Sequence, residues 1–235
     1  MGEFIKQVVL NNENRIIRYF DVEWKRDILR IECAVLFFIV PLALYWFRHL
    51  LAFKLMPVLL LLALGCMIYL ISDKAFDRSI FWNTSHFSFH MKQILITFMG
   101  ISIFLGLFTY LVYADRFFVF PIDKPNATLI FVLMYPLLGA LPQEIIFKCF
   151  FFHRYRSVFP GTLSLIIFNG LSFGLFHLWY ANIIAPIFSI FAGMILSYRY
   201  LKTKSLLAIS IEHSLMGIFL YVVGLGWFFY SGSIQ

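Results

Sequence analysis

Three ionisable side chains lie within apolar stretches of this sequence, where an unpaired charge is unfavourable. Glu144 lies in LPQEIIFKCF, His177 in FGLFHLWY and His213 in AISIEHSLMG. A carboxylate and two imidazoles accept and donate protons, so a cluster of the three is suited to activating water for hydrolysis. The same groups match a known zinc ligand set that leaves a position for a reactive water. The residues alone leave both a direct carboxylate base and a metal-bound water open.

Further polar residues share helix faces with this set. Glu144 and Lys148 are four residues apart, which predicts an ion pair that makes their burial tolerable. Asn169, Phe173 and His177 also recur at intervals of four and therefore share a face. The structural alternatives are an ion pair that only locks two helices together, and a core His177 bonded to neighbouring backbone.

The elements that carry these residues are those of a membrane protein. The chain has 235 residues, of which 62% are hydrophobic, 20% aromatic and 13% charged. A soluble domain has about 25% charged and about 45–50% apolar residues. The net charge of +7 comes from short basic clusters between apolar runs, a pattern that sets membrane topology. We therefore expect an all-α membrane protein that contacts lipids and binds no nucleic acid.

Apolar segments of about 20 residues can cross a bilayer as helices. The predicted spans are 31–47, 55–72, 93–113, 127–150, 162–180, 182–198 and 205–229. The last span contains several glycines and could hold two short helices, so a bundle of seven to eight transmembrane helices is expected. Ionisable residues inside such spans commonly have a function.

The basic residues predict how this bundle is oriented. Lys and Arg concentrate at the N-terminus and on alternate loops, which predicts a cytoplasmic N-terminus. Residues 1–30 are basic and partly apolar, so we expect an amphipathic arm against anionic headgroups, with a short solvated tail as the alternative. Residues 31–235 are expected to form one polytopic membrane domain.

The order of the polar residues resembles that of a known family. The chain reads QEIIFK at 143–148, FGLFH at 173–177 and HSLMG at 213–217. These stretches are similar to EExxxR, FxxxH and HxxxN or HxxxD, the motifs of the CAAX prenyl protease and bacteriocin-processing (CPBP) family of intramembrane proteases. The resemblance covers about residues 127–222. It implies that Glu144 and His177 activate water or bind a metal, and that His213 steadies the oxyanion.

The chain departs from that pattern at three positions. Gln143 stands at the first glutamate position, and an amide cannot act as a base. Lys148 stands at the arginine position and lacks the forked geometry of a guanidinium. Gly217 stands at the Asn position and has no side-chain donor, so the oxyanion would depend on His213, Gln143 or a backbone amide. Glu212 could replace the missing carboxylate, although it points about 100° away from His213 around the helix.

These features predict a multi-pass protein of the bacterial inner membrane. Its expected function is an intramembrane endopeptidase that hydrolyses a peptide bond of a membrane-associated peptide or protein through Glu- and His-activated water. Two alternatives stay open. One is a catalytically inactive membrane adaptor of the same fold, which Gln143 and Gly217 favour. The other is a transporter that uses Glu144 and Glu212 as proton carriers.

Overall fold

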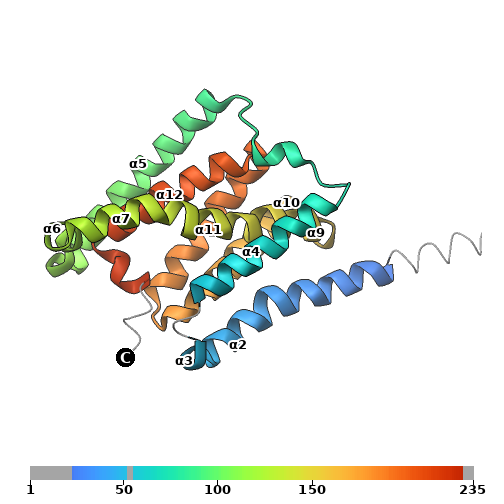
Figure 1. The fold of residues 1–235 in the computed structure, drawn as a ribbon, viewed down its shortest axis with the longest axis horizontal. Helices are drawn as coiled ribbons and strands as arrows, with labels where there is room; N and C mark the ends of the chain where they lie inside the picture. Colours follow the sequence, from blue (N-terminus) through green and yellow to red (C-terminus); the bar gives the residue numbers. More distant parts are fainter. Residues whose placement is uncertain (1–22, 52–54, 230–235) are drawn as a thin grey trace, which may run out of the picture.

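The computed structural model describes residues 23–51 and 55–229, which form a bundle of helices without strands (Figure 1). Six helices of this part of the chain are long and apolar enough to cross a membrane. They are Glu23–Trp46, Leu55–Ser72, Phe87–Val112, Pro125–Val158, Thr162–Tyr180 and Ile184–Thr203. A shorter apolar helix, Leu206–Val222, joins them. The predicted all-α membrane bundle is confirmed.

The longer helices divide into named elements. They are α2 (Val40–Trp46), α3 (Arg48–Leu51), α4 (Leu55–Ser72), α5 (Phe87–Val112), α6 (Val119–Asp123), α7 (Pro125–Tyr135), α8 (Leu141–Glu144), α9 (Phe151–Tyr155), α10 (Thr162–His177), α11 (Ile184–Thr203) and α12 (Leu206–Val222). Short 3₁₀ segments at Leu178–Tyr180 and Leu225–Phe229 follow α10 and α12. Of the one or two helices expected for the last span, the structure has a helix that ends before Gly224, whose φ is 117°, and a short segment after it.

The ends of two helices differ from the predicted spans. Residues 23–30 of the predicted arm lie in the first described helix, Glu23–Trp46. Residues 1–22 of that arm lie outside the described part of the chain. The fourth helix runs to Val158, beyond the predicted end of the span at residue 150.

The helix that carries Glu144 contains two π-helical turns. Pro136–Ala140 and Ile145–Phe150 are π-helical, and α8 lies between them. Proline has no N–H, so Pro136 and Pro142 each remove one i→i−4 hydrogen bond from this region. π-helical turns of this kind are frequent at functional sites. The wider winding rotates the side chains that follow Glu144 away from their α-helical positions.

Glycines bring α10 and α11 close together. A Cβ at Gly174 would lie 2.8 Å from the carbonyl oxygen of Pro186, and one at Gly193 would lie 3.1 Å from Gly170 Cα. Small residues allow this approach of helix backbones in membranes. The contact fixes the end of α10, where His177 is found.

The shorter helix α12 is packed inside the bundle. It contacts α5, α11 and the π-helical turn before α8, and Figure 1 shows it alongside α5. Outward faces of the long helices are apolar: Leu61 and Ile103 are 68% and 69% exposed. Such faces are suited to lipid, while α12 presents His213 to the helix of Glu144.

Candidate active site

Glu144 and His213 form a buried pair between α8 and α12. His213 Nδ1 lies 2.7 Å from Glu144 Oε1. Glu144 has no exposed surface and His213 is 7% exposed. Because a carboxylate oxygen accepts, His213 donates its Nδ1–H to Glu144 and keeps Nε2 for another partner. This is the arrangement in which a carboxylate orients an imidazole and stabilises its protonated form.

The second carboxylate oxygen of Glu144 has no partner. Oε2 is buried and makes no hydrogen bond within the described residues. Buried polar atoms are nearly always bonded, so an exception calls for an explanation such as a catalytic role or a bound water. The unpaired oxygen is therefore the feature of Glu144 that a structural ion pair alone does not explain.

A cavity of about 510 Å³ lies in front of the two histidines. His177, His213 and Gln143 contribute polar groups to its wall, whereas Glu144 is not part of the lining. Most of the remaining wall is apolar and includes Phe188 and other aromatic side chains of α5 and α11. A mainly apolar cavity of this size with a few polar groups is typical of a ligand site.

His177 is held at the end of α10 by its own helix. Its Nδ1 lies 2.8 Å from the Phe173 carbonyl oxygen. A carbonyl oxygen only accepts, so Nδ1 carries the proton and a neutral His177 has its lone pair on Nε2. The Phe173 ring lies against both imidazoles, with centroid distances of 4.7 Å to His177 and 5.7 Å to His213. The structure thus brings both histidines to one cavity wall.

The predicted ion pair between Glu144 and Lys148 is not formed. Lys148 Nζ instead donates to Asn169 Oδ1 at 2.9 Å and lies 5.1 Å from the centre of the Phe173 ring. The reason is the π-helical winding over Ile145–Phe150, which does not place residues four apart on one α-helical face.

Asn169 connects three helices behind the cavity. Its Nδ2 donates to the Phe147 carbonyl oxygen at 2.7 Å, within the π-helical turn. Its Oδ1 also accepts from Ser197 on α11 at 2.7 Å. The amide therefore bonds backbone that the irregular winding leaves available, and it fixes α10 against the helix of Glu144. Asn169, Phe173 and His177 share one face of α10, as their spacing of four residues predicts.

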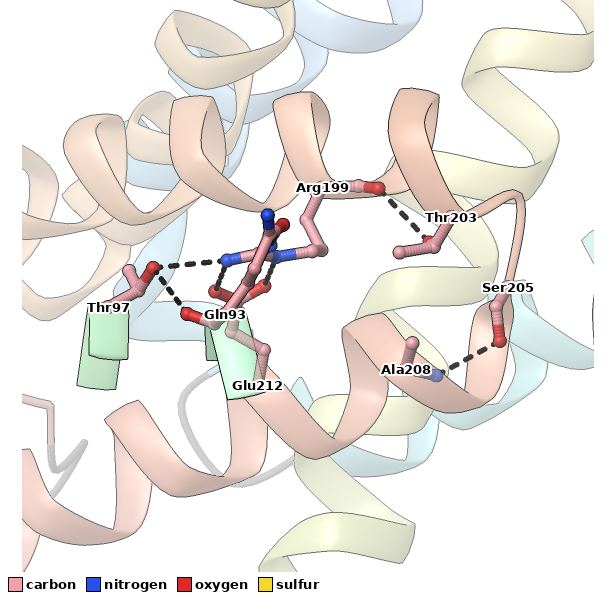
Figure 2. Close-up of polar contacts among 7 residues, drawn as sticks. All are labelled: Gln93, Thr97, Arg199, Thr203, Ser205, Ala208 and Glu212. Carbon is pink, nitrogen blue, oxygen red and sulfur yellow. Dashed lines mark hydrogen bonds and ion pairs between the residues drawn. The ribbon is translucent and has the colours of Figure 1, made fainter. Parts of the chain in front are cut away.

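Glu212 belongs to a different cluster. Arg199 Nε donates to Glu212 Oε2 at 2.8 Å and Nη2 donates to Oε1 at 3.0 Å. The same guanidinium donates to Gln93 Oε1 and Thr97 Oγ1 on α5, both at 3.0 Å (Figure 2). Glu212 is absent from the cavity wall. The suggestion that it replaces the missing carboxylate is therefore corrected: both oxygens are bound by Arg199, because the residue points away from His213.

The proposed zinc ligands do not converge. In the described ranges 23–51 and 55–229, no three His, Cys, Asp or Glu side chains gather closely enough to hold a metal ion. Glu144 Oε1 is bonded to His213 Nδ1 instead of meeting both imidazoles at a common point. The residues as they lie therefore do not fit a metal.

Sequence reasoning missed Tyr135, which also lines the cavity. Its ring centre lies 6.0 Å from that of His213. A Cβ at Gly217 would meet the Tyr135 hydroxyl and ring, and one at Gly139 would lie 2.7 Å from Tyr135 Cδ2. The tyrosine therefore occupies space that two glycines leave. The available signal was a glycine one turn after Tyr135 and another one turn after His213.

Comparison with known proteins identifies the region that carries this site. Residues 125–230 match a family model described as type II CAAX prenyl endopeptidase Rce1-like. The match contains every residue of the cavity site discussed above except those of α5. It confirms the resemblance to the CPBP family. No curated protein and no solved structure matches the chain.

Proposed function

Because residues 125–230 match the model of the Rce1-like type II CAAX prenyl endopeptidases, we propose that this multi-pass membrane protein is an intramembrane endopeptidase. The observation that carries the proposal is the 2.7 Å contact between His213 Nδ1 and Glu144 Oε1. It is supported by the position of His177 in the wall of the same cavity. Together they supply one imidazole that can accept a proton from water and one that can donate a hydrogen bond to the carbonyl oxygen of the substrate.

His177 is the general base of the proposed reaction. Its Nδ1–H is held by the Phe173 carbonyl oxygen, so Nε2 accepts a proton from water while the water oxygen attacks the scissile carbonyl carbon. The π electrons of the carbonyl move onto its oxygen. This assigns the water-activating role to His177 directly, with Glu144 acting through His213.

His213 is the electrostatic partner of that oxygen. Its Nε2–H donates to the developing oxyanion, and the Glu144 carboxylate stabilises the imidazolium through Nδ1. When the tetrahedral intermediate collapses, the C–N bond breaks and the proton on His177 Nε2 passes to the leaving nitrogen. The products are a carboxylic acid and an amine, and both histidines return to their starting states.

The walls of the cavity suggest the class of substrate. Phe104, Phe188 and Phe191 are among the apolar side chains that surround it, and an apolar chain gains free energy on entering such a site. The C-terminal motif C-a-a-X carries a prenyl group on its cysteine. We therefore propose a peptide with a prenylated C-a-a-X end as substrate.

The experiment uses the full-length protein in liposomes with a farnesylated C-a-a-X peptide, and mass spectrometry detects the released fragment. Glu144→Gln keeps the shape of the side chain but removes its charge, so kcat should fall by about 10²–10⁴. Asp115→Asn makes the same acid-to-amide change at a side chain that is 77% exposed, and it should cleave like wild type. Unchanged cleavage by Glu144→Gln in a folded protein would contradict the proposal.

A non-catalytic membrane adaptor is the second candidate, which Gln143 at the first glutamate position favours. An adaptor would bind its partner without cleaving any peptide. In that case Glu144→Gln and His177→Ala would leave the cellular phenotype intact, whereas deletion of the protein would not. The two candidates are therefore separated by variants that keep the fold and remove a side chain of the proposed reaction.

A further inference from the structure

We propose that the Tyr135 hydroxyl is a second donor to the oxyanion, placed beside His213 by Gly217 and Gly139. The inference deepens the proposed endopeptidase function and rests on it. It makes Tyr135 a catalytic residue that touches the carbonyl oxygen of the substrate.

Tyr135 lies at the edge of the same reaction space as His213. It ends α7 and lines the cavity together with His213 and His177. Its ring meets that of His213 edge to face, with an interplanar angle of 76° and a centroid distance of 6.0 Å. A carbonyl oxygen bound by His213 in this cavity would therefore lie close to the tyrosine.

Gly217 determines where the hydroxyl lies. It is one turn after His213 on α12 and also lines the cavity. A Cβ at this position would meet the Tyr135 hydroxyl itself. The hydroxyl therefore takes up the space in which any larger residue at 217 would begin its side chain. A polar group is thus present beside His213 although position 217 has no side chain of its own.

Two further contacts fix the ring. A Cβ at Gly139 would lie 2.7 Å from Tyr135 Cδ2, so only glycine fits beneath the ring. The Phe131 ring stacks on Tyr135 with a centroid distance of 4.9 Å and an interplanar angle of 28°. A donor held in place before the reaction stabilises developing charge without reorganisation.

The Tyr135 hydroxyl can still donate a hydrogen bond. Among the described residues, Tyr135 makes ring contacts but its hydroxyl has no hydrogen-bond partner. The hydroxyls of Tyr69 and Tyr155 are both bonded, to Arg154 and Glu32. Tyrosine hydroxyls removed from bulk water normally find a partner. A partnerless hydroxyl at the cavity wall is consistent with a donor that bonds when substrate is present.

A tyrosine hydroxyl suits this role chemically. It donates one O–H and stays neutral at physiological pH, so it stabilises the oxyanion without a change of its own protonation. With the imidazolium of His213, it would give the oxygen two donors from different helices. The loss of one oxyanion donor costs about 10²–10³ in kcat.

The first test measures cleavage of the farnesylated C-a-a-X peptide by Tyr135→Phe in the full-length protein. The ring contacts remain, so kcat should fall by about 10²–10³ while KM changes little. Tyr198→Phe is the matched control, because Tyr198 is 52% exposed on α11 and lies outside the cavity wall. It should cleave at the wild-type rate.

The second test uses a phosphinate analogue of the peptide, whose tetrahedral phosphorus carries an oxygen at the oxyanion position. Tyr135→Phe should weaken its binding by the factor lost in kcat/KM, because both report transition-state stabilisation. A merely structural tyrosine would weaken binding of the uncleaved peptide and of the phosphinate equally, which would overturn the inference.

The outcomes separate this inference from the function on which it rests. Full cleavage by Tyr135→Phe beside an inactive Glu144→Gln would overturn the role of Tyr135 and leave the endopeptidase standing. A wild-type protein that neither cleaves the peptide nor binds the phosphinate would overturn both.

Discussion

Arg199 binds both carboxylate oxygens of Glu212 inside the bundle, with N–O distances of 2.8 and 3.0 Å. The side chains are 5% and 0% exposed, and the guanidinium also reaches Gln93 and Thr97 on α5. The contact joins α5, α11 and α12 through one planar cation (Figure 2). The ion pair explains why the Glu212 carboxylate is buried in α12, and it gives Glu212 a structural role outside the proposed reaction.

The first prediction concerns the stability of this contact. Arg199→Met leaves the Glu212 carboxylate buried without its partner, so the free energy of unfolding should fall by about 3–5 kcal/mol. Adding Glu212→Met should recover part of that loss, because no buried charge remains. Denaturant titration in detergent measures both variants. Equal stability of wild type and Arg199→Met would show that the guanidinium has no role in holding the helices.

The second prediction concerns Asn169. Asn169→Leu leaves the Lys148 ammonium without its acceptor and the Phe147 carbonyl without its donor. Uncompensated buried groups of this kind cost about 1–3 kcal/mol each, and more when charged. The melting temperature should fall markedly, and the double variant with Lys148→Met should recover part of it. A melting temperature that does not change would contradict the central place given to Asn169.

The third prediction concerns Gly217. A Cβ at 217 meets Tyr135, so Gly217→Ala should displace the tyrosine and lower kcat towards the value of Tyr135→Phe. The double variant Tyr135→Ala with Gly217→Asn opens the space and places an amide donor there. It should cleave at least about tenfold faster than Tyr135→Ala alone, a fraction of what one oxyanion donor contributes. Wild-type cleavage by Gly217→Ala would count against the proposed tight contact.

The fourth prediction concerns pH and a pair at the end of α4. His153 Nε2 lies 2.8 Å from Asp73 Oδ2, and this hydrogen bond, with one from the Ala75 backbone, holds the pKa of Asp73 below its ordinary value. A depressed pKa in the folded state adds stability above the unfolded pKa of about 3.9, and that stability is lost as pH falls through the folded value.

Asp73→Asn should therefore lower the melting temperature at neutral pH, and the gap from wild type should close below about pH 4. Scanning fluorimetry across a pH series makes the comparison. A gap that stayed constant to low pH would show that the Asp73 charge does not contribute.

Sequence reasoning reached the membrane bundle because long apolar runs constrain the chain on their own. Without water, each backbone polar group must be bonded within its segment, so such runs become helices. The three motifs also located the family region. Side-chain partners were harder to foresee. The Glu144–Lys148 pairing was wrong because it assumed α-helical winding, which Pro136 and Pro142 replace with π-helical turns on either side of α8.

The glycines one turn after Tyr135 and one turn after His213 do not by themselves single out this tyrosine in the sequence. It is one aromatic residue among many in an apolar chain, and its importance depends on a contact with Gly217, far away along the chain. The roles of Glu144, His177 and His213 stay predictions, to be decided by the variants proposed above.

The burial of Glu144 limits which molecules can reach its side chain from outside the protein. Its carboxylate exposes no surface, and His213 stands between it and the cavity. A carboxyl-directed reagent dissolved in the surrounding solution would thus find this acid shielded for as long as the fold holds.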